Sequence, residues 1–115
     1  MDVKIIEDHS SLLELANIAS NQFGDLVKAV VDTEKETMAI GGELHADEEA
    51  ILLEQGSKQK DLWGINLYPQ APEKDWIEFD SMINIRPSSG NRSRGVDDLE
   101  TQKKIINIVN KLVLR

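Results

Sequence analysis

The stretch Asp75–Val96, DWIEFDSMINIRPSSGNRSRGV, holds the clearest strand pattern in the chain and leads directly into its last helical segment. Side chains from Trp76 to Arg86 alternate with the period of two that is typical of a β-strand. Pro87 ends this strand because proline cannot donate to a ladder. The face directed to the core would hold Ile77, Phe79, Ser81, Ile83 and Ile85. The other face would hold Trp76, Glu78, Asp80, Met82, Asn84 and Arg86.

The segments before this strand predict helices that are interspersed with hairpins. Ser11 and Glu14 have the spacing of a capping box, and Gly24 suits a left-handed helix end, which places a helix over 11–23. Residues 26–31 and 36–40 read as an antiparallel hairpin. Three further segments precede the long strand: an edge strand over 3–6, a helix over 46–55 that buries Ala46, Ala50 and Leu53, and a strand over 62–68.

A last helix is predicted after the loop, with its N-cap among residues 97–100 and with Ile105, Ile108, Val109 and Leu112 on its apolar face. Because hairpins rather than single strands separate the helices, we expect an α+β fold. Its architecture would be one antiparallel sheet of about four to five strands with helices packed on one face. The length of 115 residues fits a single domain over residues 1–115.

The composition excludes several classes of function. A net charge of −8 argues against binding of duplex DNA or of an anionic membrane surface. The absence of cysteine excludes disulfides and thiolate catalysis, and it suits a reducing cytoplasm. The N-terminal residues lack the form of a secretion signal, and no apolar run approaches the roughly 20 residues of a membrane helix.

The arginine loop, residues 86–95, is the first candidate for a site. Residues 1–85 carry 18 acidic side chains against 6 lysines, whereas residues 86–115 carry 3 against 7 basic ones, and no arginine precedes Arg86. Guanidinium groups bind phosphate or carboxylate, and the start of a helix favours an anion. The loop supplies Arg86, Ser89, Asn91, Arg92 and Arg94 as candidate ligands of an anion. Pairing of these arginines with the protein's own acids is the competing interpretation.

The polar face of the long strand is the second candidate. Glu78, Asp80 and Asn84 share this face, and Asn66 and Tyr68 of the preceding strand would lie beside them. Two carboxylates at this spacing suit acid–base work or a divalent ion. An ordinary solvated face of an antiparallel sheet explains them equally well, although Trp76 and Met82 would then be unexpectedly exposed.

A third group lies at the start of the second helix and comprises Glu43, His45, Asp47, Glu48 and Glu49. A histidine among carboxylates could hold Mn, Fe or Zn. Acids in a first helical turn stabilise the helix dipole, however, and this explanation is favoured. No serine lies in a nucleophile-elbow motif, so the sequence assigns no catalytic residue and leaves any cofactor unknown.

Three blocks of sequence resemble a small prokaryotic family of unknown function. They are Gly41–Glu49 (GGELHADEE), the segment from Gly56 to Pro69 with GSKQ and DLWGINLYP, and Trp76–Val96. The resemblance spans roughly residues 12–112. It implies a free-standing cytoplasmic protein of a bacterium or archaeon, and it implies no activity, ligand or catalytic residue.

Three functions of different classes therefore stay open. The first is a binding module for a small anionic ligand that carries phosphate or carboxylate, held by the arginine loop and the polar strand face. The second is a structural or interaction module that acts as a homo-oligomer through Trp76, Met82 or a sheet edge. The third, which ranks behind these two, is a divalent-metal-dependent hydrolase that uses Glu78 and Asp80, with Glu43 and His45 as further candidate residues.

Overall fold

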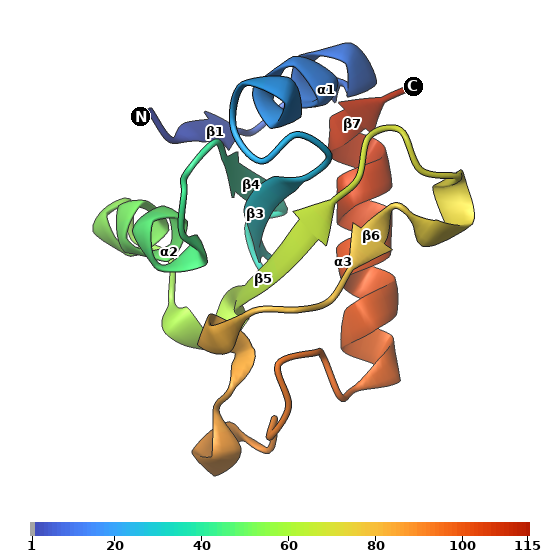
Figure 1. The fold of residues 1–115 in the computed structure, drawn as a ribbon. Helices are drawn as coiled ribbons and strands as arrows, with labels where there is room; N and C mark the ends of the chain where they lie inside the picture. Colours follow the sequence, from blue (N-terminus) through green and yellow to red (C-terminus); the bar gives the residue numbers. More distant parts are fainter. Residues whose placement is uncertain (1) are drawn as a thin grey trace.

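A computed structural model describes residues 2–115 (Figure 1). A five-stranded antiparallel sheet forms its centre, in the order β1-β4-β3-β5-β6. The strands are β1 (Lys4–Ile6), β3 (Val27–Asp32), β4 (Thr37–Ile40), β5 (Leu62–Leu67) and β6 (Ile77–Glu78). A short parallel pair, β2 (Ser10–Ser11) and β7 (Val113–Leu114), joins the two ends of the described chain. The predicted α+β class, the antiparallel sheet and the edge position of β1 are confirmed.

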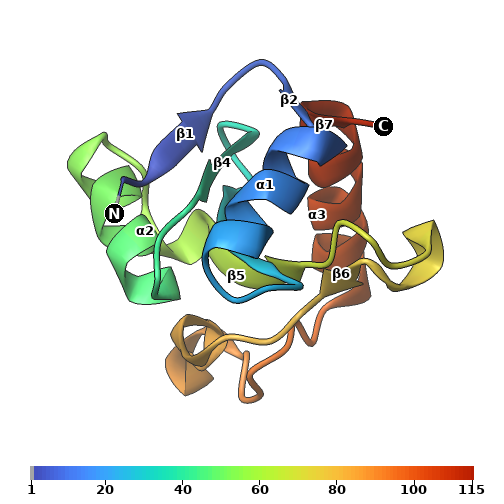
Figure 2. The same cartoon turned by 45° about the horizontal axis from the view of Figure 1, so that its top comes forward.

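The helices are α1 (Leu12–Asn21), α2 (His45–Glu54) and α3 (Leu99–Leu112), and they cover both faces of the sheet. Figures 1 and 2 place α2 on one side of the sheet and α1 with α3 on the other. On β3, Val31 packs in the core beneath α1 and α3, whereas Val30 packs with Leu52 of α2. The prediction that helices pack on one face is therefore wrong. The reason is that β3 is apolar on both faces, as a strand between two layers must be.

The first and last helices begin as their sequences predict. Ser11 caps α1 by accepting a hydrogen bond of 3.0 Å from the backbone N–H of Glu14, and Asp98 caps α3 in the same way from Thr101 at 3.0 Å. Gly24 has a positive φ of 97°, the left-handed conformation expected after α1. The four predicted apolar positions of α3 are buried.

The buried face of α2 differs from the predicted one. His45, Glu48 and Leu52 face the sheet, while Leu53 is 40% exposed and Ala46 and Ala50 lie on the outside. The apolar pattern was misleading here because two polar side chains occupy the inner face of the helix. Each of them has a hydrogen-bond partner in the backbone, which reduces the cost of burying it.

The prediction of a long strand over residues 76–86 is also wrong. Only Ile77–Glu78 pair with β5, after which the chain leaves the sheet and forms short 3-10 helices at Met82–Asn84 and Pro87–Ser89. Trp76, predicted on the polar face, is 1% exposed in the core beneath α3, and Ile85, predicted inside, is 37% exposed. Two more 3-10 helices, Gln59–Asp61 and Glu73–Asp75, flank β5 and β6.

Contacts with Gly64 of β5 explain why the strand stops. The side-chain amide of Asn84 accepts from the Gly64 N–H at 2.8 Å and donates to the Gly64 carbonyl at 2.9 Å, so it takes the place of a neighbouring strand. Ser81 fills the space beside the glycine, where an added Cβ would lie 2.5 Å from the Ser81 Cβ. A side-chain amide thus ends the sheet at the point where alternation predicted more backbone pairing.

Candidate functional site

Two buried asparagines hold the arginine loop in one conformation. Besides Gly64, the Asn84 amide donates to the carbonyl of Arg94 at 2.9 Å. The Asn91 amide donates to the carbonyls of Asn84 at 2.8 Å and Gly95 at 2.9 Å, and its oxygen accepts from the Asp97 N–H at 2.8 Å. These contacts use the amide hydrogens of both side chains. Asn84 and Asn91 therefore position the loop.

Two of the three arginines of this region, Arg86 and Arg94, have separate side-chain partners. Arg86 donates to the carbonyl oxygens of Gln59 and, at 2.9 Å, Leu62, and its guanidinium lies 4.2 Å from the ring centroid of Trp63. The Arg94 Nε lies 2.5 Å from a carboxylate oxygen of Asp80. Arg86 therefore fastens the chain before β5, while Arg94 is directed to the polar residues that follow β6.

The tip of the loop is exposed. Arg92 and Ser89 are exposed side chains, and the backbone N–H of Arg92 donates to Asp97 at 3.0 Å. The Ser93 hydroxyl donates to the same carboxylate at 2.5 Å. These bonds lower the pKa of Asp97, with the Ser93 hydroxyl as the largest cause. Asp97 therefore occupies the N–H groups that an anion at the loop tip would need.

A cavity of about 220 Å³ lies where the start of α2 meets β3, β5 and the arginine loop, and it is named here the α2 cavity. It brings together residues that are far apart in the sequence. Its polar lining residues are Lys28, His45, Asn66, Asp80 and Arg94, and Met82 belongs to its apolar rim. Two of the residues predicted as ligands, Asp80 and Arg94, thus reach a cavity, and Asn66, expected beside the strand face, joins them.

The N-terminus of α2 borders this cavity. Its N-cap is Leu44, whose side chain accepts no hydrogen bond, in contrast to the capping serine of α1 and the capping aspartate of α3. Leu44, His45 and Ala46 all line the cavity. The N–H groups of a first helical turn carry partial positive charge and favour an anion where no side chain caps them.

His45, the first residue of α2, is buried with a defined tautomer. Its Nε2 lies 2.8 Å from the carbonyl oxygen of Ile65, which can only accept, so Nε2 carries the proton and Nδ1 is the bare nitrogen of the neutral ring. Burial lowers the pKa of His45 below its usual value. The charge of Lys28 acts in the same direction, while the bond to Ile65, the charge of Asp80 and the side chain of Asn66 oppose it.

Lys28 and Asn66 lie opposite each other on β3 and β5 and have unused hydrogen-bonding capacity. The Lys28 Nζ lies 5.0 Å from the ring centroid of Phe23, and within residues 2–115 it has no hydrogen-bond acceptor and no ion-pair partner. Asn66 is 8% exposed, and its Oδ1 has no donor in the described part of the chain. A ligand that offered both an anionic oxygen and a donor would satisfy both groups.

The carboxylate of Glu78 is already bonded to two neighbouring side chains. One of its oxygens accepts from the Asn66 amide and from the Tyr68 hydroxyl, each at 2.9 Å. Burial and then this bond raise the pKa of Tyr68 to about 12, so the phenol stays protonated and donates. Glu78 therefore orients Asn66 at the edge of the α2 cavity.

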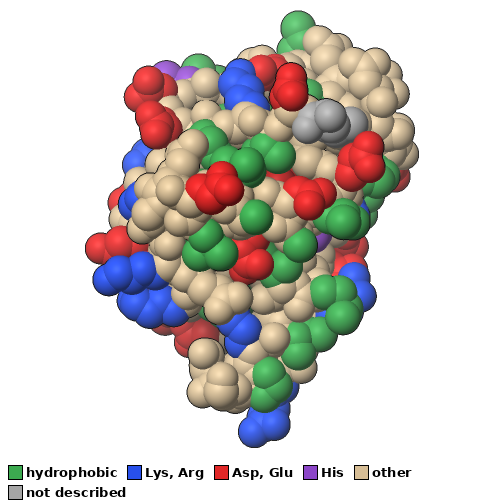
Figure 3. All heavy atoms as spheres, turned by 90° about the vertical axis from the view of Figure 1, so that its left-hand side faces the viewer, with side chains coloured by type: hydrophobic (Ala, Val, Ile, Leu, Met, Phe, Trp, Pro, Cys, Tyr) green, Lys and Arg blue, Asp and Glu red, His purple; other side chains and the backbone are tan. Residues whose placement is uncertain are grey.

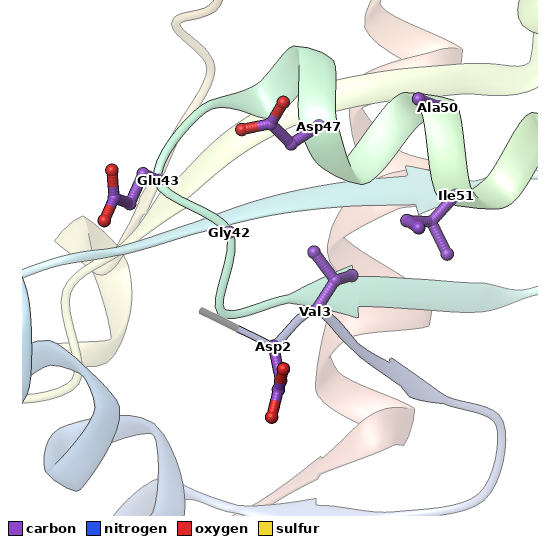
Figure 4. A pocket seen from close by; sticks show the side chains of 7 residues that line it. All are labelled: Asp2, Val3, Gly42, Glu43, Asp47, Ala50 and Ile51. Atoms are coloured by element: carbon purple, nitrogen blue, oxygen red, sulfur yellow. The ribbon is translucent and has the colours of Figure 1, made fainter.

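A different cavity, of about 780 Å³, lies between α2 and the first described residues, and it is named here the acidic cavity (Figure 4). Val3 and Ile51 face each other across it, with Asp47 and Glu43 on the same side as the start of α2. Figure 3, which views the molecule from the α2 side, shows apolar side chains interspersed with acidic ones. The carboxylates make this cavity unsuitable for an anion.

Glu48 is buried and is bonded to Gly42, which lines the acidic cavity. Its Oε2 accepts from the backbone N–H of Gly42 at 2.9 Å, and its Oε1 has no partner within residues 2–115. Burial is the main reason why the pKa of Glu48 is raised to about 9, against the opposing effects of the Gly42 bond and Lys28. The acid is therefore neutral at pH 7.

The histidine and acids of residues 43–49 are dispersed by the fold. His45 enters the α2 cavity, whereas Glu43 and Asp47 line the acidic cavity. Over residues 2–115 no group of three or more His, Asp or Glu side chains could hold a metal ion. In the same range, no helix has the length and apolar character needed to cross a membrane.

Lys28 and His45 are the site residues that sequence reasoning missed. A lysine within the apolar strand VKAVV could have indicated Lys28, because a charge flanked by buried positions needs a polar environment. His45 was considered only as a metal ligand. What brings both residues to Arg94 is the packing of α2 against the sheet.

Comparison with known proteins gives one match. Residues 4–112 match the model of a family described as "Protein of unknown function (DUF5674)". No curated protein and no solved structure matches the chain.

Proposed function

The chain belongs to this family of unknown function, DUF5674, and we propose from its geometry that it binds a small anionic ligand, bearing phosphate or carboxylate, in the α2 cavity. One observation carries the proposal. Lys28, a lysine without a hydrogen-bond or ion-pair partner in residues 2–115, borders the same cavity as a helix start that no side chain caps.

The charges around the cavity support an anion. Lys28 and Arg94 are cationic, and Asp80 already pairs with Arg94, so one positive charge is left without a partner among the lining residues. The dipole of α2 adds to it. A ligand anion would give Lys28 a partner, and the pair would lie partly out of water, where charge-assisted hydrogen bonds are strongest.

The arginine loop has a supporting role in this proposal. Asn84 and Asn91 hold the loop so that Arg94 and Asp80 meet at the cavity. Arg94 would bind the ligand, and Asp80 would orient its guanidinium. Rigid supporting contacts of this kind reduce the ordering that binding must otherwise bring about.

Thermal unfolding in inorganic phosphate and in acetate tests the proposal, with sodium chloride matching the ionic strength. Because phosphate stabilises many proteins by exclusion from their surfaces, the comparison between variants decides the result. Lys28→Gln removes the cation of the cavity, and Lys104→Gln removes an exposed lysine of α3. We expect one or both anions to raise the melting temperatures of the wild type and of Lys104→Gln. The rise in Lys28→Gln should be much smaller. An equal rise in all three proteins, or no rise, contradicts the proposal.

A further inference from the structure

A second cavity adjoins the α2 cavity and shares two of its lining residues, Lys28 and Leu44. It has a volume of about 450 Å³ and lies between the end of α1 and the start of α2. Phe23 lines it and is 43% exposed, so it is named here the Phe23 cavity. The two cavities meet at the lysine that the proposed function assigns to the anion.

The chemistry of the Phe23 cavity differs from that of its neighbour. Its lining includes the aromatic residue Phe23, the amide residue Asn21 and the acid Glu43, which also lines the acidic cavity. The carboxylate repels a second anionic group and accepts hydrogen bonds from N–H or O–H donors. An uncharged aromatic group with such donors would fit, because it can pack against Phe23 and donate to Glu43.

The volumes are compatible with a ligand that occupies both cavities. Sites for small organic molecules enclose about 300–1,000 Å³. The α2 cavity, at about 220 Å³, is below this range and has room for a phosphate group. The adjoining Phe23 cavity, at about 450 Å³, lies within the range and has room for a larger group.

We propose that the ligand class is a nucleoside monophosphate, with its phosphate in the α2 cavity and its base in the Phe23 cavity; this inference rests on the proposed function. Lys28 lies at the junction: it lines both cavities, and its Nζ is 5.0 Å from the centroid of the Phe23 ring. A ribose hydroxyl or the protonated oxygen of a phosphate monoanion would donate to the bare Oδ1 of Asn66.

The test compares dissociation constants for inorganic phosphate, adenosine monophosphate and uridine monophosphate, measured by calorimetry or by fluorescence. At least one nucleotide is expected to bind about tenfold or more tightly than phosphate. Phe23→Leu keeps an apolar side chain but removes the ring, so it should weaken the nucleotide about three- to tenfold and leave phosphate unchanged. Lys28→Gln should weaken both ligands.

Leu99→Ala truncates another exposed apolar residue, on α3, and should change neither constant. Backbone amide spectra of each variant establish that it is folded. If phosphate binds and neither nucleotide binds more tightly, or if Phe23→Leu has no effect on the nucleotide, this inference fails and the anion site stands. If neither phosphate nor a nucleotide binds, this inference fails. If acetate does not bind either, the proposed function fails as well.

Discussion

The Nε2 of His45 lies 2.8 Å from the backbone carbonyl oxygen of Ile65, which joins the first residue of α2 to strand β5. This bond fixes the neutral tautomer of the ring. It also fixes where the positive end of α2 lies relative to Lys28 and Arg94, which line the same cavity. The histidine is thus a structural part of the proposed anion site and a group whose protonation the anion can influence.

The pH dependence of His45 is the first prediction. Its pKa is lowered in the folded protein, chiefly by burial, so the unfolded chain takes up a proton at a higher pH than the native one. The contribution of His45 to stability is therefore present above pH 6.5 and is lost as the pH falls through the folded pKa. Imidazole carbon–proton NMR, with His9→Gln to assign the signals, should give a midpoint for His45 below 6.5. A midpoint at or above 6.5 would contradict it.

Anion binding should reverse part of that shift. A bound phosphate would add negative charge beside the imidazolium, and the newly protonated Nδ1 could donate to the bare Oδ1 of Asn66. We expect the NMR midpoint of His45 to rise in phosphate. The midpoint in Lys28→Gln should respond less to phosphate. A midpoint that phosphate leaves unchanged in the wild type argues against an anion near this ring.

Glu48 should make the protein less stable as the pH rises. Its pKa of about 9 in the folded protein exceeds the ordinary value of 4.5, so the native state keeps a proton that the unfolded state releases. Stability is highest below pH 4.5 with respect to this group and falls as the pH rises toward 9. Glu48→Gln removes this dependence and should stabilise the protein by on the order of 2–3 kcal/mol at pH 7. Urea unfolding of both proteins at pH 5, 7 and 8 measures this difference in the free energy of unfolding. A difference that stays the same at all three pH values would refute the prediction.

Asn84 should contribute strongly to stability because its amide replaces a strand beside Gly64. Asn84→Ala leaves the buried N–H and carbonyl of Gly64 without their partner, and it removes one of the two donors to the carbonyl of Arg94, which keeps the Ser81 N–H. The expected loss is about 2–4 kcal/mol in the free energy of unfolding. Asn107→Ala, at an exposed position of α3, should cost less than about 0.5 kcal/mol. A small effect of Asn84→Ala would show that backbone pairing can resume at this edge.

Gly64 should tolerate no side chain while Ser81 stands beside it. Gly64→Ala would place a Cβ 2.5 Å from the Ser81 Cβ, and the shift this forces should cost about 1–3 kcal/mol. Adding Ser81→Gly to Gly64→Ala makes room and should recover part of the loss. The comparison needs Ser81→Gly alone, because the Ser81 hydroxyl also accepts from the Ile83 N–H. If the double variant is no more stable than Gly64→Ala, the steric explanation is wrong.

Much of the fold could be predicted because its signals are local. The caps at Ser11 and Asp98, the left-handed Gly24 and the hairpin of β3 with β4 each depend on residues close in sequence. These signals identified the helices and the antiparallel sheet. They also placed a loop before α3.

The parts of the fold and of the site that could not be predicted depend on contacts between segments that are distant in the sequence. Trp76 is buried because α3 and Arg115 cover it, and residues after Glu78 leave the sheet because Asn84 binds Gly64 twenty positions earlier. Alternation within the strand carries no information on either contact. The same holds for the α2 cavity, where residues from two strands, one helix and a loop meet. Sequence patterns nominated Arg94 and Asp80, but they could not show that Lys28 and His45 lie in the same cavity.

The most direct test of the anion site is a phosphate titration followed by amide NMR of the uniformly labelled protein. We expect saturable shifts at the backbone amides of His45 and Ala46 and at residues 80–82, with little change at Arg92 on the loop tip. Lys28→Gln should lose that saturation, and Lys104→Gln should keep it. Shifts that grow linearly with phosphate, that centre on the loop tip, or that persist unchanged in Lys28→Gln would contradict an anion site at the start of α2.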